Sequence, residues 1–213
     1  MPLLLELFSG TGSVGKVAKE FGYEVISLDK DMEATLRMDI MSWEYKLAPP
    51  KTFDVIWASP PCTEYSRAKT CGVRQIESAN EIVKRTLEII NYYNPKYWII
   101  ENPQTGLLKI QPFMIGIPFK DIDYCKYGMP YRKRTRLWNN VDLWSPRPLC
   151  CRDCNSMNEE RTRHIQEAQQ GGSTAERRRT QQTFRTDELY VVPAELIREI
   201  FSACDLNADD ASE

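Results

Sequence analysis

The segment LLLELFSGTGS at residues 3–13 sets a short apolar run directly before a glycine-rich loop. The run has the length of a buried strand, and Val14, Val17, Ala18 and Phe21 then recur at the spacing of one helix face. Glycine lets a backbone approach a ligand closely and adopt left-handed conformations, so such a loop is a candidate binding loop. The segment therefore predicts a strand, a ligand-binding loop and a helix in succession.

Three further apolar runs follow the same plan. We predict strands at Glu24–Leu28, Phe53–Ala58 and Tyr97–Ile100, and a helix that opens with a capping box at Ser78 and ends before Asn94. Strands that alternate with amphipathic helices are typical of an α/β domain with a mainly parallel sheet. Ligands of such sheets bind at the carboxyl ends of the strands, and each of these runs ends in a polar or proline-rich motif.

The apolar pattern divides the chain into four parts. Residues 1–143 carry the strand and helix patterns and form the predicted main domain. Residues 144–187 lose these patterns and are rich in Pro, Cys, Arg, Gln and Gly, which predicts a small irregular insertion. Residues 188–204 regain an apolar face and are expected to return to the main sheet as a helix. Residues 205–213 are polar and acidic and are expected to be disordered.

Composition excludes several classes of protein. The chain has 213 residues, 42% of them hydrophobic, and no apolar run approaches the roughly 20 residues that a membrane span needs. No signal-peptide pattern follows the first apolar run, so we expect a soluble, cytoplasmic protein that is not secreted. Seven cysteines, an odd number, argue against a disulfide framework. The net charge of −2 does not itself indicate a nucleic-acid partner, although basic residues cluster at 126–136 and 161–185.

The loop at residues 9–12 and two acidic residues point to one kind of ligand. The loop lacks the Gly-Lys-Ser/Thr end of a phosphate-gripping loop, so an NTPase is not expected. Asp29 ends the second predicted strand, where a carboxylate can accept hydrogen bonds from ribose hydroxyls, although a helix cap or turn residue would look the same. Asp39 could reach an adenine amino group. Together these features predict an adenosine-containing ligand.

Cys62 is the candidate nucleophile. It follows Ser59-Pro60-Pro61 after a buried strand, so two prolines stiffen the backbone that holds its thiol at the sheet edge. Most free cysteines are buried structural residues, but Glu101 ends a neighbouring strand after three apolar residues, where an acid is costly without a partner. The basic cluster at residues 132–136 would supply positive charge that stabilises a thiolate. A structural thiol and a structural salt bridge of Glu101 remain the open alternatives.

In their order and spacing these motifs resemble those of the C5-cytosine DNA methyltransferase family, in particular its small phage- or virus-type members. The resemblance covers most of residues 3–140 and resumes weakly at 187–204. It rests on four motifs: Phe8–Gly15, Ser59–Cys62, Glu101-Asn102-Pro103 and, after Tyr127–Pro130, the arginine pair Arg134 and Arg136.

The resemblance implies a DNA (cytosine-5)-methyltransferase that takes its methyl group from S-adenosyl-L-methionine and has the Rossmann-like sheet of such enzymes. Cys62 would attack carbon 6 of a cytosine flipped out of DNA, Glu101 would hold ring N3 and the amino group, and Arg134 with Arg136 would hold the base and the thiol. The cofactor would contact Phe8, Ser9, Gly10, Thr11, Gly12, Ser13, Val14, Asp29, Lys30, Asp39, Ile40, Ser59 and Pro60.

The rest of the chain would serve the same reaction. Residues 144–187 would recognise the target, and the loop Thr63–Gln75, with Ser66, Arg67, Lys69 and Arg74, would close over the flipped nucleotide. The enzyme would act as a monomer, in the cytoplasm or inside the host cell of a virus or phage. Tyr131 stands where the family has Gln, and one extra residue separates it from the arginine pair, which leaves the register of that pair open.

Three other functions stay open at this point. An amino-methyltransferase carries an aromatic residue after its Pro-Pro pair, where this chain has Cys62. An RNA cytosine-5 methyltransferase, such as one that modifies tRNA, would use the same constellation. A non-catalytic nucleic-acid-binding relative would not need Cys62, Glu101 and the arginine pair together.

A group of cysteines in the predicted insertion raises the question of a metal. Cys150, Cys151 and Cys154 precede His164, the only histidine of the chain. A structural zinc site needs four ligands, and these four residues are the available set. Two adjacent cysteines on one ion are geometrically awkward, and the family does not require a metal. We therefore predict free thiols and no metal, with a zinc site as the alternative.

Overall fold

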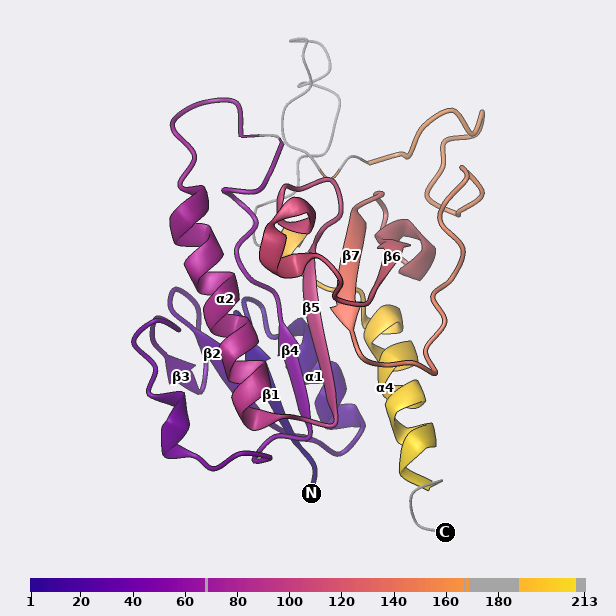
Figure 1. The fold of residues 1–213 in the computed structure, drawn as a ribbon. Coiled ribbons are helices and arrows are strands. Elements are labelled where there is room, and N and C mark those ends of the chain that lie inside the picture. Colours follow the sequence, from indigo (N-terminus) through magenta and orange to yellow (C-terminus); the bar gives the residue numbers. More distant parts are fainter. Residues whose placement is uncertain (68, 167, 169–187, 210–213) are drawn as a thin grey trace.

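A seven-stranded sheet runs through the molecule (Figure 1). The computed structural model describes all residues except 68, 167, 169–187 and 210–213. The strand order across the sheet is β3-β2-β1-β4-β5-β7-β6. The strands are β1 Leu3–Leu7, β2 Glu24–Asp29, β3 Leu36–Arg37, β4 Val55–Ala58, β5 Tyr97–Pro103, β6 Phe119–Asp123 and β7 Arg134–Asn139.

The sheet is parallel from β1 to β5, and β7 is antiparallel to both of its neighbours. All four residues of β4 are buried, as expected for a central parallel strand with helices on both faces. The predicted α/β class and the mainly parallel sheet are therefore confirmed. Strands β6 and β7 were not predicted, because their sequences are mostly polar and contain no long apolar run.

Helices cover both faces of the sheet. In Figure 1, α2 Ile76–Tyr93 lies in front of the sheet, while α1 Ser13–Glu20 and α4 Ala194–Asp209 lie behind it. Val83 and Ile90 of α2 belong to one buried cluster, and Val17 of α1 belongs to the other with Leu196 and Phe201 of α4. Short 3-10 helices complete the described chain: η1 Tyr45–Leu47, η2 Leu108–Ile110, η3 Pro112–Met114, η4 Tyr124–Tyr127 and η5 Glu188–Tyr190.

Two helix boundaries differ from the predictions. Helix α2 begins at Ile76, two residues before the capping box predicted at Ser78, and its N-cap Gln75 makes no side-chain cap. Helix α4 extends to Asp209, so the segment predicted to be disordered from 205 starts as helix. Once a packed helix exists, each added residue gains a hydrogen bond without a new nucleation cost, which explains the extension.

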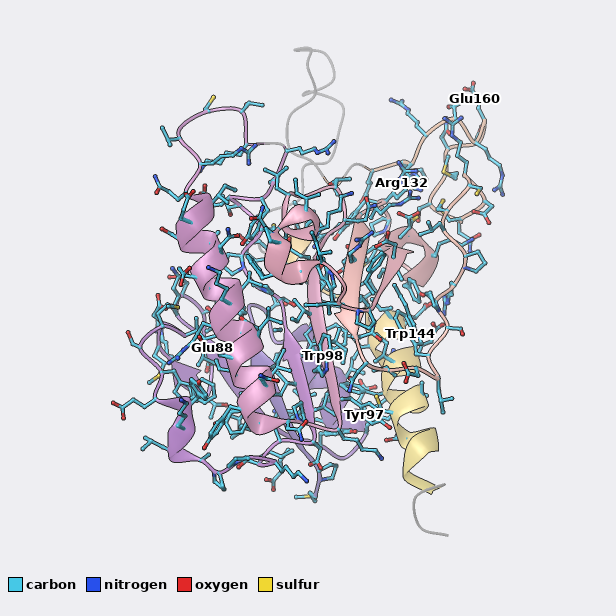
Figure 2. The ribbon with its side chains drawn as sticks, viewed as in Figure 1. Glu88, Tyr97, Trp98, Arg132, Trp144 and Glu160 are labelled. Carbon is cyan, nitrogen blue, oxygen red and sulfur yellow. The ribbon has the colours of Figure 1, made fainter. Side chains whose placement is uncertain are left out.

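The insertion lies along the β6 edge of the sheet. Residues 144–166 contain no helix or strand and make only isolated bridges, between Met157 and His164 and between Tyr131 and Gln166. Figure 2 labels Trp144, where the segment begins near α4, and Glu160, which lies farthest from the sheet among the labelled residues. The proposed boundaries of this insertion stay a prediction. None of the helices in the described part of the chain is long and apolar enough to span a bilayer.

Candidate active site

The loop that follows β1 is curled by left-handed residues. Phe8, Gly10 and Gly12 have positive φ angles of 58°, 51° and 66°. Asp29, at the end of β2, accepts a hydrogen bond from the Gly10 N–H through Oδ2 at 2.9 Å. Positive φ is open to glycine and unfavourable for Phe8, so the curled loop depends on its glycines and on this carboxylate.

Asp29 also shapes the turn that follows it. Its Oδ1 accepts hydrogen bonds from the N–H groups of Asp31 and Met32, each at 2.9 Å. The Asp29 carboxylate therefore links the loop after β1 to the turn after β2. Its contact with a ribose stays a prediction, for which Oδ2, which accepts only the Gly10 hydrogen bond among the described residues, has a second lone pair.

Glu6 is a buried acid beneath the loop, and it was not among the residues predicted from the sequence. Its carboxylate accepts hydrogen bonds from Gly15 N–H at 3.0 Å and Val14 N–H at 3.3 Å, at the start of α1. Burial raises the pKa of Glu6 to about 7 despite these two bonds, because only 3% of the residue is exposed. The sequence signal was an acid inside the apolar run of residues 3–8.

A cavity of about 380 Å³ opens at the carboxyl ends of β1, β2, β4 and β5. Of the residues predicted to contact a cofactor, it is lined by Phe8, Ser9, Gly10, Ser13, Val14, Asp29, Lys30, Asp39, Ile40, Ser59 and Pro60. Thr11 and Gly12 belong to the loop without lining the cavity. The hydroxyls of Ser9 and Thr11 are buried with no hydrogen-bond partner among the described residues.

The segment at residues 188–192 closes one side of the cavity. Tyr190 and Val192 line it, and the Val192 N–H donates to Ser13 Oγ at 3.1 Å. Lys133 Nζ donates to the Leu189 carbonyl at 3.1 Å. The segment after the insertion thus contacts the loop after β1 and Lys133, and it supplies cavity residues that were not predicted from the sequence.

Cys62 lines the same cavity at the end of the Ser59–Cys62 turn. Asn102, in the next strand along the sheet, donates a buried hydrogen bond from Nδ2 to the Pro60 carbonyl at 2.9 Å, so β5 holds this turn in place. Burial raises the pKa of the Cys62 thiol above its ordinary value, Lys133 lowers it, and Glu101 raises it further. The thiol is therefore largely desolvated, and Lys133 favours its ionised form.

Glu101 faces this cavity from β5. The Tyr124 hydroxyl donates to its Oε1 at 3.0 Å, and Lys133 Nζ lies 3.6 Å from the same oxygen. The basic cluster at residues 132–136 was predicted to supply positive charge here. In the structure Lys133 of that cluster lies beside the acid together with Tyr124, and the acid stays in contact with the cavity that contains Cys62.

The strand register explains why the arginine pair lies elsewhere. Glu101 pairs with Leu137 across the β5–β7 ladder, and side chains two residues apart share a face, so Lys133, four residues before Leu137, lies on the face of Glu101. Arg134 and Arg136 point to the other face, where each makes two hydrogen bonds to a carboxylate of β6, Arg134 to Asp123 and Arg136 to Asp121. Neither arginine lines the cavity. Lys133 lines the cavity in their place, and the role of the arginines in holding the base stays a prediction.

The loop Thr63–Gln75 is folded on itself, as far as its described residues show. Lys69 Nζ forms an ion pair with Glu64 at 2.6 Å. Arg74 donates to the carbonyls of Glu64, Ser66 and Lys69 at 2.7–2.9 Å. Two of the four residues predicted to face a nucleotide are therefore engaged inside the loop in this structure.

Comparison with known proteins places the chain in a family. The model of the C-5 cytosine-specific DNA methylase family matches residues 5–109. A "Probable DNA (cytosine-5)-methyltransferase" of Frog virus 3 (isolate Goorha) is 33% identical in an alignment 221 positions long, which covers 94% of this chain and 99% of the viral protein. The chain belongs to the C-5 cytosine-specific DNA methylase family. The family and the enzyme class predicted from the sequence are confirmed.

A solved structure supports the fold. It is an E. coli protein encoded within a prophage and named as a DNA modification methyltransferase, with 15% sequence identity and a TM-score of 0.52. The match covers 70% of this methylase chain and 52% of the prophage protein, so the chain spans about half the length of that relative. The methyltransferase sheet predicted from the sequence is thereby confirmed.

Proposed function

We propose that this chain methylates carbon 5 of cytosine in DNA, with S-adenosyl-L-methionine as the methyl donor and Cys62 as a covalent nucleophile. The observation that carries the proposal is the single cavity that joins Cys62, Glu101 and the loop after β1. A structural thiol would not need an acid and a lysine at the same cavity. The family membership supports the same reaction.

The residues around the loop fit the proposed donor. The cavity volume of about 380 Å³ lies within the range of small-molecule sites. Asp29 and Asp39 offer carboxylate acceptors for hydroxyl and amino groups, while Phe8 and Ile40 supply apolar wall. The buried Ser9 hydroxyl has no hydrogen-bond partner among the described residues, so a polar ligand could satisfy it. When bound, the donor supplies an electrophilic methyl group on a sulfonium.

The roles of the protein side chains follow from their positions. The Cys62 sulfur forms a bond to cytosine carbon 6, which turns carbon 5 into the nucleophilic carbon of an enamine. Glu101, held by Tyr124, contacts ring N3 and the amino group, and Lys133 balances negative charge beside the thiol. After methylation, loss of the carbon 5 proton re-forms the double bond as the carbon–sulfur bond to Cys62 breaks.

The substrate and the setting belong to the same proposal. A cytosine in duplex DNA must leave the base stack to reach Cys62, at a cost of a few kcal/mol. The viral relative supports action inside a host cell. A monomer acting in the cytoplasm is the simplest arrangement, and we include it in the proposal.

Covalent trapping tests the proposal directly. DNA that contains 5-fluorocytosine should form a denaturant-stable adduct with the wild-type protein in the presence of the methyl donor. Fluorine takes the place of the carbon 5 proton and cannot leave as a cation, so the bond to Cys62 is not released. Cys62→Ser should form none. Cys71→Ser is the matched control, since Cys71 is an exposed thiol in the neighbouring loop, and it should form the adduct.

The outcomes separate the alternatives. An adduct on RNA but not on DNA would overturn the DNA substrate and favour an RNA cytosine-5 methyltransferase. No adduct on either would refute the covalent mechanism. Bisulfite sequencing of plasmid from expressing cells should show cytosines that resist conversion to uracil and report their sequence context.

A further inference from the structure

Four side chains with metal-binding atoms converge beside η4, outside the cavity that contains Cys62. They are Cys125 of η4, Cys150, Cys154 and His164. Their ligand atoms all lie within 4.8 Å of one another, and the three cysteines are buried. Three thiols cannot all pair as disulfides, and the imidazole adds a fourth donor of the same metal preference.

The distances to the imidazole match a tetrahedral site. His164 Nε2 lies 3.4 Å from Cys154 Sγ and 3.6 Å from Cys150 Sγ. Zinc with Zn–S bonds of about 2.3 Å and Zn–N bonds of about 2.0–2.1 Å places sulfur and nitrogen about 3.6 Å apart in a tetrahedron. Small side-chain movements would therefore complete the coordination.

The backbone around Cys150 is also arranged for a thiolate ligand. The backbone N–H groups of Arg152 and Cys154 lie beside the Cys150 sulfur. Arg152 holds a left-handed φ of 69°, which is unfavourable for a non-glycine residue and persists only where the surroundings impose it. The Cys150 N–H in turn donates to Asp123 Oδ2 at 3.0 Å. Hydrogen bonds of this kind orient metal ligands.

The described part of the insertion is fastened to the main domain by the buried Trp144 and by the ion pairs of Arg147 with Glu199 and of Asp153 with Lys126, but its own buried cluster is small. Its small buried cluster consists of Cys125, Cys150, Cys154 and Met157, and residues 144–166 contain no helix or strand. So few apolar side chains bury little area, and small irregular segments commonly depend on a metal or on disulfides.

We propose that Cys125, Cys150, Cys154 and His164 bind a structural zinc ion that fastens the insertion to the main domain. Three sulfurs and one imidazole form a closed donor set, the typical arrangement of a structural zinc site. The sequence analysis preferred free thiols because its set contained the adjacent pair Cys150 and Cys151. The structure replaces Cys151, which is exposed, with Cys125, and the geometric objection disappears.

The zinc site would also support the active site. Cys125 directly follows Tyr124, whose hydroxyl holds Glu101, and it lies two residues after Asp123, which binds Arg134. A metal on Cys125 would fix η4 and with it the position of the Tyr124 side chain.

Metal content tests this proposal without reference to activity. The full chain, purified with reductant from zinc-supplemented medium and dialysed, should contain one zinc ion per chain by inductively coupled plasma mass spectrometry. Cys151→Ser, the matched control, should keep the zinc, and Cys125→Ser should lose most of it. His164→Cys should keep zinc through four sulfurs, and its Co²⁺-substituted form should show stronger thiolate charge-transfer absorption than Co²⁺-substituted wild type.

Three results would overturn the proposal. The first is wild-type protein without zinc whose Co²⁺ form lacks tetrahedral d–d bands. The second is equal zinc loss in Cys151→Ser and Cys125→Ser. The third is a peptide map, made without reductant, that shows a disulfide between two of the three proposed cysteine ligands. Because the wild-type measurements need no variant to fold, they decide the question even if Cys125→Ser is insoluble.

Discussion

Replacing Glu6 with glutamine should change how the stability of the protein depends on pH. Glu6 lies in β1 beneath the cofactor loop and is 3% exposed. Burial raises its pKa from 4.5 to about 7, against the opposing effect of hydrogen bonds from Gly15 and Val14. An unfolded chain exposes this carboxyl to water and returns its pKa to the ordinary value.

The sign and size of the effect follow from these two pKa values. Between them the folded chain binds more protons at Glu6 than the unfolded chain does, so stability falls as the pH rises. The contribution is complete below about pH 4.5 and is lost above about pH 7. From about pH 5 to about pH 8 the loss is about 2.5 kcal/mol, since one unit of pKa corresponds to about 1.4 kcal/mol.

Urea unfolding of wild type and Glu6→Gln across this pH range measures the effect. Glutamine keeps the size of the side chain and does not titrate, so other ionisable groups, and any bound metal, cancel in the difference between the two proteins. The wild type should lose about 2.5 kcal/mol relative to the variant between about pH 5 and about pH 8. A difference that does not change with pH would show that the carboxyl is ionised, or solvated, in both states, and would refute the reasoning.

Two further substitutions test the catalytic geometry. Lys133→Gln should lower turnover about tenfold at neutral pH and move the pH profile of turnover to higher pH, because loss of the cation further raises the pKa of Cys62. Arg136→Gln is the control, since the charge of Arg136 is paired with Asp121 outside the cavity, and it should leave the pH profile in place. A shifted profile in Arg136→Gln alone would favour the arginine prediction. Asn102→Ala should cost about 1–3 kcal/mol in urea unfolding, because the buried Pro60 carbonyl loses its donor, and it should slow formation of the 5-fluorocytosine adduct. Unchanged stability and adduct rate would show that this bond does not position the nucleophile.

Most residues predicted to form the site line one cavity, because they follow continuous apolar strands. The strands predicted to end near Phe8, Asp29 and Cys62 do so, and parallel pairing brings those ends to one cavity. The predicted placement of Glu101 beside Cys62 follows from the adjacent pairing of β4 and β5. A local apolar pattern is sufficient to place these residues, because the carboxyl ends of parallel strands always meet at the same edge of the sheet.

Sequence reasoning failed where a face or a distant partner decides the role of a residue. In the run at 132–136, alternate side chains face opposite sides of β7, so only the register against β5 selects Lys133 over Arg134. A basic cluster has no internal feature that reveals this register. The carboxylates Asp121 and Asp123, spaced by two like the arginines, were a usable signal for the cross-strand pairs.

The same reason explains the cysteines. Cys150 and Cys154 are close in sequence, and the search for ligands near them led to Cys151, which the turn directs away from the cluster and toward the Leu149 carbonyl. Cys125 is distant in sequence and is brought in by η4, next to the tyrosine that holds Glu101. One 3-10 turn thus positions both a proposed metal ligand and the hydroxyl that orients the acid of the active site. Zinc removal should therefore weaken the support of Glu101 as well as loosen the insertion, because both depend on the position of η4.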